Sequence, residues 1–154
     1  RYLEAARKAH GFVKAKLWDA GSKTLFHRWR DDDLDRSQQA ESYLYLLRGS
    51  RVLYEATLEP GYLAFAVELA EKAREVFYDE ENGGFFDGEK REDLVMRLKD
   101  DFDSATPTSS SVGRLEFTIL AEITGRKDFR EVAEKSLRAV VPTLEKAPTS
   151  LAES

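Results

Sequence analysis

Apolar residues recur at helical spacing in three stretches of the chain, residues 2–18, 61–78 and 128–145. In the second stretch, acidic and basic residues occupy the face opposite the apolar one: Glu68, Glu71, Lys72 and Glu75. This pattern is typical of helices that pack on one side and meet water on the other. We therefore expect three outer helices, and we expect Pro142 to kink the last one or end it early.

Two further stretches, residues 37–57 and 108–124, are apolar almost all round. Ser37 is a candidate N-cap for the first of them. A helix that is apolar on most sides lies between neighbours. The expected order along the chain is therefore outer, inner, outer, inner, outer.

The connections between these helices alternate in length. Long loops, 19–36 and 79–107, follow the first two outer helices, whereas the inner-to-outer connections are brief. Within the loops, Thr24–Trp29 and Leu94–Leu98 are candidates for short strands. Both long loops should fall at the same end of the stack, where binding chemistry tends to lie in helical arrays.

The chain also repeats itself after 60 residues. Leu17-Trp18-Asp19 returns as Phe77-Tyr78-Asp79, Leu25-Phe26 returns as Phe85-Phe86, and a weaker third copy begins at Phe129. Such a repeat predicts stacked supersecondary units. We expect an all-α fold of antiparallel helical hairpins. A tetratricopeptide-type solenoid is the alternative, but its repeats are near 34 residues with short loops on both sides.

The composition is that of one globular domain spanning residues 1–154. The chain has 154 residues, 42% hydrophobic and 34% charged, with a net charge of −5 and no basic block, so nucleic acid is not the expected partner. It has no apolar run of membrane-spanning length and no cysteine, which excludes disulfides and thiolate chemistry and fits the cytoplasm. Because the sequence opens at Arg1 in an already periodic helix, we expect a fragment of a longer chain.

Several motifs resemble those of a known family. They are Tyr78-Asp79-Glu80-Glu81-Asn82-Gly83-Gly84-Phe85-Phe86-Asp87, Arg97-Leu98-Lys99-Asp100, Asp103-Ser104-Ala105-Thr106-Pro107 and Ser111-Val112. Together they resemble the C-terminal part of the YyaL / spermatogenesis-associated protein 20 family. That resemblance implies part of an (α/α)6 toroid, similar to N-acylglucosamine 2-epimerases and six-hairpin glycosidases. It also implies that a thioredoxin-like domain of the longer proteins is absent here.

The motifs depart from the family pattern in two places. Between Asp103 and Val112, serine replaces two glycines and an asparagine of the family pattern, at positions 104, 109 and 110. At the start of the first inner helix, Glu41-Ser42-Tyr43-Leu44 lacks one of two acids. If these positions form a site in the family, that site is altered in this chain.

Glu41 and Asp103 are the candidate catalytic carboxylates. Each lies near the start of an inner helix, and a pair of carboxylates can act as acid and base on a sugar. The simpler interpretation is that Glu41 stabilises a helix N-terminus and that Asp103 forms a turn before Pro107.

Four other residues are candidates for substrate binding. Arg97 and Lys99 could hold a carboxylate or phosphate, although pairing with the aspartates at 100, 101 and 103 is simpler. Tyr43 and Trp29, together with Phe102, could form a platform for a sugar ring, although aromatic residues at such junctions more often belong to the local core.

Histidine and metal chemistry find little support in the sequence. His10 lies on an apolar stripe and is expected to be a core histidine, whereas His27 lies in a loop beside Trp29. The run from Asp79 to Lys90 fails the calcium-loop pattern because its twelfth residue is not glutamate. We expect no metal and no cofactor.

Two functions are therefore carried forward. The first is a carbohydrate-binding or carbohydrate-processing domain, with or without catalysis, that takes a small sugar at the long loops. The second is a non-catalytic helical interaction module, which pairs with a second copy or with the missing N-terminal part of the same chain because uncovered apolar faces need a partner.

Overall fold

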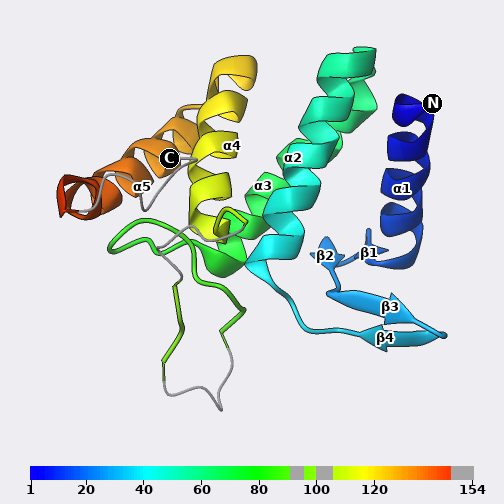
Figure 1. Cartoon of the computed structure of the whole chain (residues 1–154), viewed down its shortest axis with the longest axis horizontal. Coiled ribbons are helices and arrows are strands. Elements are labelled where there is room, and N and C mark those ends of the chain that lie inside the picture. Colours follow the sequence, from blue (N-terminus) through cyan, green and yellow to red (C-terminus); the bar gives the residue numbers. More distant parts are fainter. Residues whose placement is uncertain (91–95, 100–105, 147–154) are drawn as a thin grey trace. The chain divides into compact units, whose positions relative to one another are not determined.

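The computed structural model describes residues 1–90, 96–99 and 106–146. Within these residues the chain forms five helices and four very short strands (Figure 1). The helices are α1 (Tyr2–Lys16), α2 (Ala40–Thr57), α3 (Pro60–Phe77), α4 (Ser109–Thr124) and α5 (Lys127–Lys146). The strands are β1 (Trp18–Asp19), β2 (Thr24–Leu25), β3 (Arg28–Arg30) and β4 (Asp33–Asp35). All five expected helices are thus confirmed.

Two details of the predicted helices are wrong. Ser37 does not cap α2, because its N–H and its hydroxyl both donate to Asp35 Oδ1 at 3.0 and 2.8 Å. The helix begins three residues later, with Gln39 at its N-cap. The second detail is an early end at Pro142, because α5 continues to Lys146; a kink at Pro142, the other expectation, stays a prediction. A proline removes only one hydrogen bond of the helix, and the bonds on either side can hold the remaining turns in place.

The contacts divide the chain into two compact units, residues 1–73 and 74–154, with the boundary inside α3. The first unit contains α1, α2 and two small antiparallel hairpins, β1–β2 and β3–β4. In Figure 1, α1 and α2 run in opposite directions, joined by these hairpins. The core of this unit is built from apolar side chains of β2, α2 and α3: Leu25, Tyr43, Leu44, Leu47, Phe65, Leu69 and Ala70.

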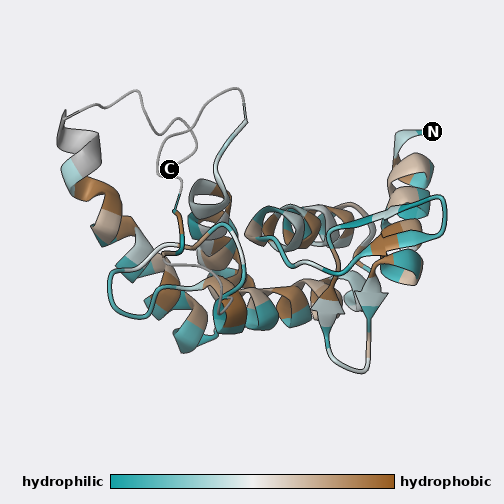
Figure 2. Ribbon diagram, turned by 90° about the horizontal axis from the view of Figure 1, so that it is seen from below, coloured by the Kyte–Doolittle hydropathy of each residue, from teal (hydrophilic) through white to brown (hydrophobic). Residues whose placement is uncertain are grey.

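The second unit packs α4 against α5 and against the segment that follows α3. Its core contains a chain of aromatic rings: Phe85 lies 5.4 Å from Phe117, and Phe117 lies 5.3 Å from Phe129, measured between ring centroids. Helix α4 is buried on most sides, as predicted for an inner helix. Figure 2 colours the residues by hydropathy, and it shows hydrophobic bands along the helices and hydrophilic residues in the loops.

The 60-residue repeat is confirmed in backbone geometry. After α1, Trp18 pairs with Leu25 and the N–H of Phe26 donates to Leu17 O at 3.0 Å. The segment after α3 repeats both bonds at the same offset: Tyr78 pairs with Phe85, and the N–H of Phe86 donates to Phe77 O at 2.9 Å. The first two outer helices, α1 and α3, therefore lead into the same small β-turn structure.

The first predicted strand is present as β2 and β3. For the second, Leu94 and Val95 lie outside the described residues, and Met96–Leu98 form no strand. Among the described residues, no helix combines the length and the apolar character needed to cross a bilayer.

One outer helix differs from the prediction. No residue of α1 is fully buried, and Leu3 and Phe12 on it are 40% and 49% exposed. Helix α3, by contrast, buries Phe65, Leu69 and Ala73. The apolar stripe of α1 is therefore present, but much of it remains uncovered.

Candidate functional site

The turn after α3 is built around the carboxylate of Asp79. Its oxygens accept the N–H groups of Glu81 and Asn82 at 2.9 and 3.0 Å, and they form an ion pair with Lys99 at 2.5 Å. Burial raises the pKa of Asp79, but the hydrogen bonds from Lys99, Asn82 and Glu81 outweigh burial and hold that pKa below its usual value. Asp79 is therefore an anion at the centre of a closed turn.

Lys99, a predicted binding residue, is held by this turn. Besides pairing with Asp79, its ammonium donates to Gly83 O at 2.8 Å and lies 4.8 Å from the ring centre of Phe86. The sequence had pointed to aspartates 100, 101 and 103 as simpler partners, and these lie outside the described residues. The partner that the structure shows lies 20 residues before Lys99.

Arg97 is used in a similar way. Its guanidinium donates to Gly88 O at 2.8 and 3.2 Å and to Val76 O at 2.7 Å, and it lies 4.1 Å from the ring centre of Phe86. Burial lowers the pKa of Arg97, and the nearby charge of Asp79 opposes that change. Arg97 thus fastens the long loop to the end of α3.

A polar cavity of about 310 Å³ opens beside this turn. Residues from the turn, α4 and α5 line it, together with Lys99: Asn82, Gly83, Gly84, Arg114, Ala139 and Val140. Arg114 is 1% exposed and donates to Ser111 Oγ at 2.8 Å. Gly83 has a positive φ of 77°, and a Cβ there would lie 2.8 Å from Lys135 O, so only glycine fits. With ammonium, guanidinium and amide groups in its wall, the cavity suits a ligand rich in hydroxyl or acidic oxygens.

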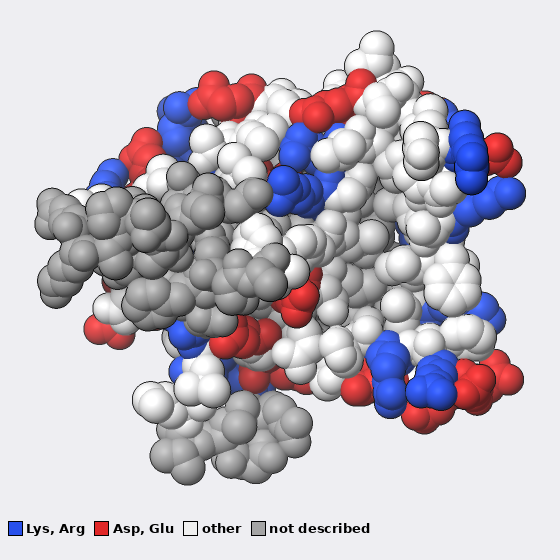
Figure 3. Space-filling view, in the orientation of Figure 1, with Lys and Arg blue, Asp and Glu red and all other residues white. Residues whose placement is uncertain are grey.

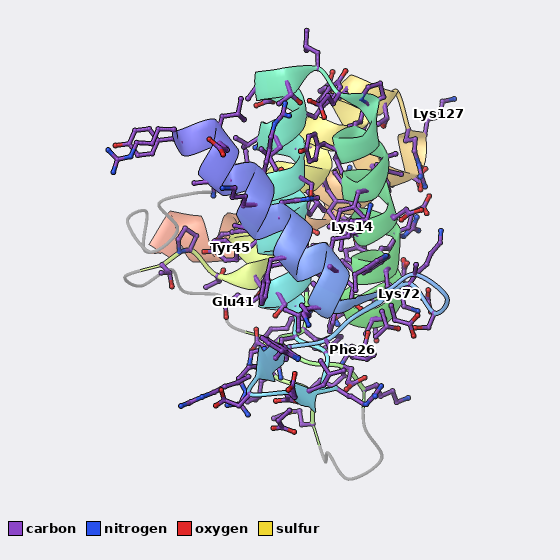
Figure 4. All side chains as sticks on the ribbon, turned by 90° about the vertical axis from the view of Figure 1, so that its right-hand side faces the viewer. Lys14, Phe26, Glu41, Tyr45, Lys72 and Lys127 are labelled. Carbon is purple, nitrogen blue, oxygen red and sulfur yellow. The ribbon has the colours of Figure 1, made fainter. Side chains whose placement is uncertain are left out.

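In the first unit, Glu41 lies in the first turn of α2, where its side chain is exposed at the loop end of the helix (Figure 4). Asp103, its proposed partner, lies outside the described residues. Because Glu41 and Asp103 belong to different units, their common mouth stays a prediction. The expectation that the two long loops lie at the same end of the stack also stays a prediction.

Tyr43 is fully buried, and its hydroxyl is engaged on both sides. It accepts the N–H of Leu25 at 2.7 Å and donates to Gln38 Oε1 at 2.7 Å. The phenol therefore ties β2 to α2. Contact between Tyr43 and a sugar would require the intervening loop to move.

Trp29 lies half-buried on β3, packed against α1. Its ring lies 5.8 Å from that of Phe12, and the ammonium of Lys16 lies 4.6 Å from its centre. One side of the indole is thus packed against α1, and the tryptophan remains a candidate aromatic surface for a sugar.

Both histidines have local partners. His10 Nε2 lies 3.0 Å from Ser50 Oγ, and its ring meets Tyr62 edge-on with the centroids 5.1 Å apart. Burial and the charge of Lys14 lower its pKa. His27 Nδ1 lies 3.4 Å from Ser42 Oγ. In the described part of the chain, no three histidine, aspartate or glutamate residues gather as a metal site would require.

Sequence reasoning missed Asp79 and Arg114 as members of this region. A signal for Asp79 existed, because Asp19 occupies the corresponding place in the first repeat and Oδ1 of Asp19 accepts the N–H of Gly21 at 2.9 Å. For Arg114 there was none, since nothing in the spacing shows that an arginine in an inner helix borders a cavity.

Comparison with known proteins shows which proteins this chain is similar to. No model of a known protein family matches it. Spermatogenesis-associated protein 20 of Mus musculus is 35% identical over 115 residues, which is 73% of this chain and 15% of the mouse protein. The human protein is 34% identical over the same length. The chain is homologous to a segment of spermatogenesis-associated protein 20. An uncharacterized protein of Caenorhabditis elegans, B0495.5, is 27% identical over 98% of this chain and 21% of its own length.

These matches confirm the resemblance that the motifs suggested. The chain spans only about 15% of the spermatogenesis-associated protein 20 sequences that it matches. The activities of those full-length proteins are therefore not shown for this chain.

Solved structures confirm the toroid fold. A glycoside hydrolase family 76 mannosidase, Bt3792 of Bacteroides thetaiotaomicron, matches 90% of this chain and 37% of its own with a TM-score of 0.70 at 19% identity. The Lin0763 protein of Listeria innocua matches 93% and 39% with a TM-score of 0.72 at 20% identity. Cellobiose 2-epimerase of Spirochaeta thermophila matches 90% and 37% with a TM-score of 0.66 at 21% identity. At these identities the likeness establishes an α/α-toroid architecture and nothing about the reaction.

Proposed function

We propose that this chain is part of a carbohydrate-binding α/α toroid. The observation that carries the proposal is the fold, which a mannosidase and an epimerase that acts on cellobiose share with it. The cavity lined by Lys99 and Arg114 supports it, because hydroxyl-rich ligands are recognised by convergent polar groups. The absence of cysteine supports a cytoplasmic setting as part of the same proposal.

The proposed roles follow the residues singled out in the sequence. Glu41 and Asp103 would supply the two carboxylates of acid–base chemistry. Trp29, Arg97 and Lys99 would contact the sugar directly. Tyr43 would affect sugar binding indirectly, because its hydroxyl holds the loop in place. Any catalysis depends on the two carboxylates facing one mouth.

A sugar-binding assay tests this proposal. Mannose, glucose and cellobiose are titrated into the chain by calorimetry, and hydrolysis and epimerisation are followed by chromatography. We expect millimolar binding, and for any turnover a loss of about 100-fold or more in Glu41→Gln and Asp103→Asn. Glu55→Gln, near the other end of α2, is the matched control. Absence of binding by all three sugars would contradict the proposal.

A non-catalytic interaction module is the second candidate function. A specific observation favours it: an apolar groove of about 700 Å³ between α1 and α2. Apolar grooves of this kind mark binding surfaces for other proteins. Sedimentation of the chain tests this candidate, because a dimer would place a second copy of the chain on the apolar surface.

A further inference from the structure

The polar cavity of the second unit, about 310 Å³ in volume, grades from exposed to buried along its wall. Asn82 and Ala139 are exposed, the side chain of Lys99 is 18% exposed, and Arg114 is 1% exposed. A ligand that enters from the side of Asn82 and Ala139 would therefore pass Lys99 before it meets the guanidinium. The cavity is a pocket with a buried cation, and Figure 3 shows the charged side chains that lie outside it on one face of the surface.

Two side chains near the mouth of the cavity can still donate hydrogen bonds to a ligand. The ammonium of Lys99 carries three N–H groups, and the structure assigns two of them, to Asp79 and to Gly83 O. The amide of Asn82 carries two N–H groups, and one of them donates to Asp79 Oδ2 at 3.2 Å. Both side chains are held in place by Asp79, so their remaining donors are already positioned before a ligand binds.

The charges around the cavity favour an anion. Its described lining holds two cations, Lys99 and Arg114, and no acid. Asp79 offsets the charge of Lys99, whereas a guanidinium stays protonated at any pH of interest. Counted over these three groups, the cavity keeps one positive charge.

The acids nearest in sequence do not cancel this charge within the cavity. Glu80 pairs with Arg74 at 3.4 Å, and its neighbour Glu81 is exposed. Neither of them belongs to the described lining. Glu116 is only two residues from Arg114, but side chains two apart on a helix do not face each other, and Glu116 lies outside that lining too. On α5, Glu134 pairs with Arg138 at 2.8 Å.

The size of the cavity and its charge narrow the ligand further. Ligand pockets span about 300–1,000 Å³, so a cavity of about 310 Å³ suits a single sugar unit. A carboxylate brings one negative charge, whereas a phosphate brings about 1.5 to 2 at pH 7 and would exceed the charge of one guanidinium. A guanidinium also matches the planar geometry of a carboxylate. The cavity therefore suits a sugar with one carboxylate.

We propose that this cavity binds a sugar acid, a monosaccharide that carries one carboxylate. Arg114 attracts the carboxylate, and Lys99 and Asn82 donate hydrogen bonds to the ring hydroxyl groups. The inference rests on the proposed carbohydrate function, and it narrows the ligand from sugars in general to acidic ones. Arg114 is a binding residue in this proposal and takes no part in acid–base chemistry.

The direct test compares glucuronate with glucose, which share a ring and differ in a carboxylate. Each is titrated into the chain by calorimetry at low and at high salt. We expect glucuronate to bind about tenfold or more tightly than glucose, with part of the difference lost as salt rises. Acetate and glucose 6-phosphate complete the panel. Both should bind about fivefold or more weakly than glucuronate, because acetate lacks the ring and the phosphate brings excess charge.

Two changes of Ala139 make a matched pair for this test. Ala139 is exposed on α5 and lines the cavity, and Ala139→Glu and Ala139→Gln add side chains of the same length that differ in charge. Glucuronate should bind to Ala139→Glu about tenfold more weakly than to Ala139→Gln, because like charges repel, whereas glucose should bind to both alike. Val141→Glu is the control for position, since Val141 is 46% exposed on the same helix outside the lining. It should change glucuronate binding by less than about twofold.

Arg114→Gln removes the proposed anchor itself. Because Arg114 is buried, its circular-dichroism spectrum is compared first with that of the parent chain. In a folded Arg114→Gln chain, the affinity for glucuronate should fall to that for glucose. If the variant does not fold, the Ala139 pair still decides the question, because an exposed position tolerates both changes.

The outcomes separate this inference from the carbohydrate function on which it rests. Equal affinity for glucuronate and glucose would overturn the sugar-acid inference and leave the carbohydrate function standing. Binding of no sugar, neutral or acidic, would overturn both. Acetate or glucose 6-phosphate binding as tightly as glucuronate would reveal a general anion site and overturn the inference. Equal glucuronate binding by Ala139→Glu and Ala139→Gln would place the ligand elsewhere and overturn it too.

Discussion

The hydroxyl of Tyr43 accepts the backbone N–H of Leu25 at a distance of 2.7 Å. The second repeat has the equivalent bond, from the N–H of Phe85 to the hydroxyl of Ser110 at 3.1 Å. In each unit, therefore, an inner helix uses a hydroxyl group to hold the small β-turn that follows an outer helix. A tyrosine reaches across a wider gap than a serine, so the same bond is kept with different side chains.

Removing this hydroxyl should destabilise the first unit. Tyr43→Phe keeps the ring but leaves the buried N–H of Leu25 without its acceptor, which costs about 1–3 kcal/mol. We expect that loss in the free energy of unfolding measured with urea. Tyr54→Phe, on the same helix, is the control and should change stability by less than about 0.5 kcal/mol. Equal effects of the two changes would show that the bond contributes nothing.

The lowered pKa of Asp79 leads us to expect that the free energy of unfolding depends on pH. Its pKa in the folded chain is lowered, so its contribution is present above the unfolded value of about 3.9 and is lost as pH falls through and below that value. Asp79→Asn should therefore lower stability at pH 7 and flatten the loss of stability between about pH 4 and 2. Urea unfolding at several pH values measures this.

The control for Asp79 is its exposed neighbour Glu80, which pairs with Arg74 at 3.4 Å on the surface. Glu80→Gln is expected to change the unfolding free energy by less than about 1 kcal/mol at any pH. If Asp79→Asn keeps the full acid slope of the parent chain, the ion pair with Lys99 is not its source.

Two helix ends adopt the left-handed conformation with different residues. Gly125 ends α4 with a φ of 69°, and Leu58 ends α2 with a φ of 56°. Only glycine adopts this conformation without strain. Gly125→Ala should destabilise the chain by about 1 kcal/mol, and Leu58→Gly should stabilise it by about 0.5–1 kcal/mol. Thermal unfolding of both variants should shift in opposite directions; shifts in the same direction would contradict this account.

Helix α4 has a side-chain cap, whereas α2 has none. Thr108 Oγ1 accepts the N–H of Ser111 at 3.1 Å, but Gln39 makes no such bond at the start of α2. Thr108→Ala is expected to cost about 1 kcal/mol. Gln39→Ala should cost less than about 0.5 kcal/mol in the same chemical denaturation assay. A larger loss in Gln39→Ala would show that the cap is not the cause.

The sequence predicted the helices well, because each depends on local spacing. An apolar stripe specifies a helix wherever it packs, so residues 61–78 and 108–124 were placed within a few residues of α3 and α4. Helix starts were less predictable. Ser37 has the right chemistry for a cap, but the neighbouring Asp35 takes up both of its donors.

The candidate site was predictable only in part. Arg97 and Lys99 were recognised as cations of a loop, but their partners are carbonyl oxygens and Asp79, which the fold brings close from up to 21 residues away. Tyr43 was recognised as an aromatic residue at a helix start, yet its full burial depends on how β2 crosses it. Hydrogen bonds across such separations leave no periodic signal.

Amino-acid order alone determined the repeat, the alternation of helix types and the kinship with spermatogenesis-associated protein 20, since these follow from local spacing and residue identity. Only the folded chain decided which polar groups are satisfied and which apolar faces remain open. Burial is a property of what packs nearby, and the stripe on α1 looks the same in sequence as the stripe on α3. The tertiary structure left the first largely exposed and buried the second.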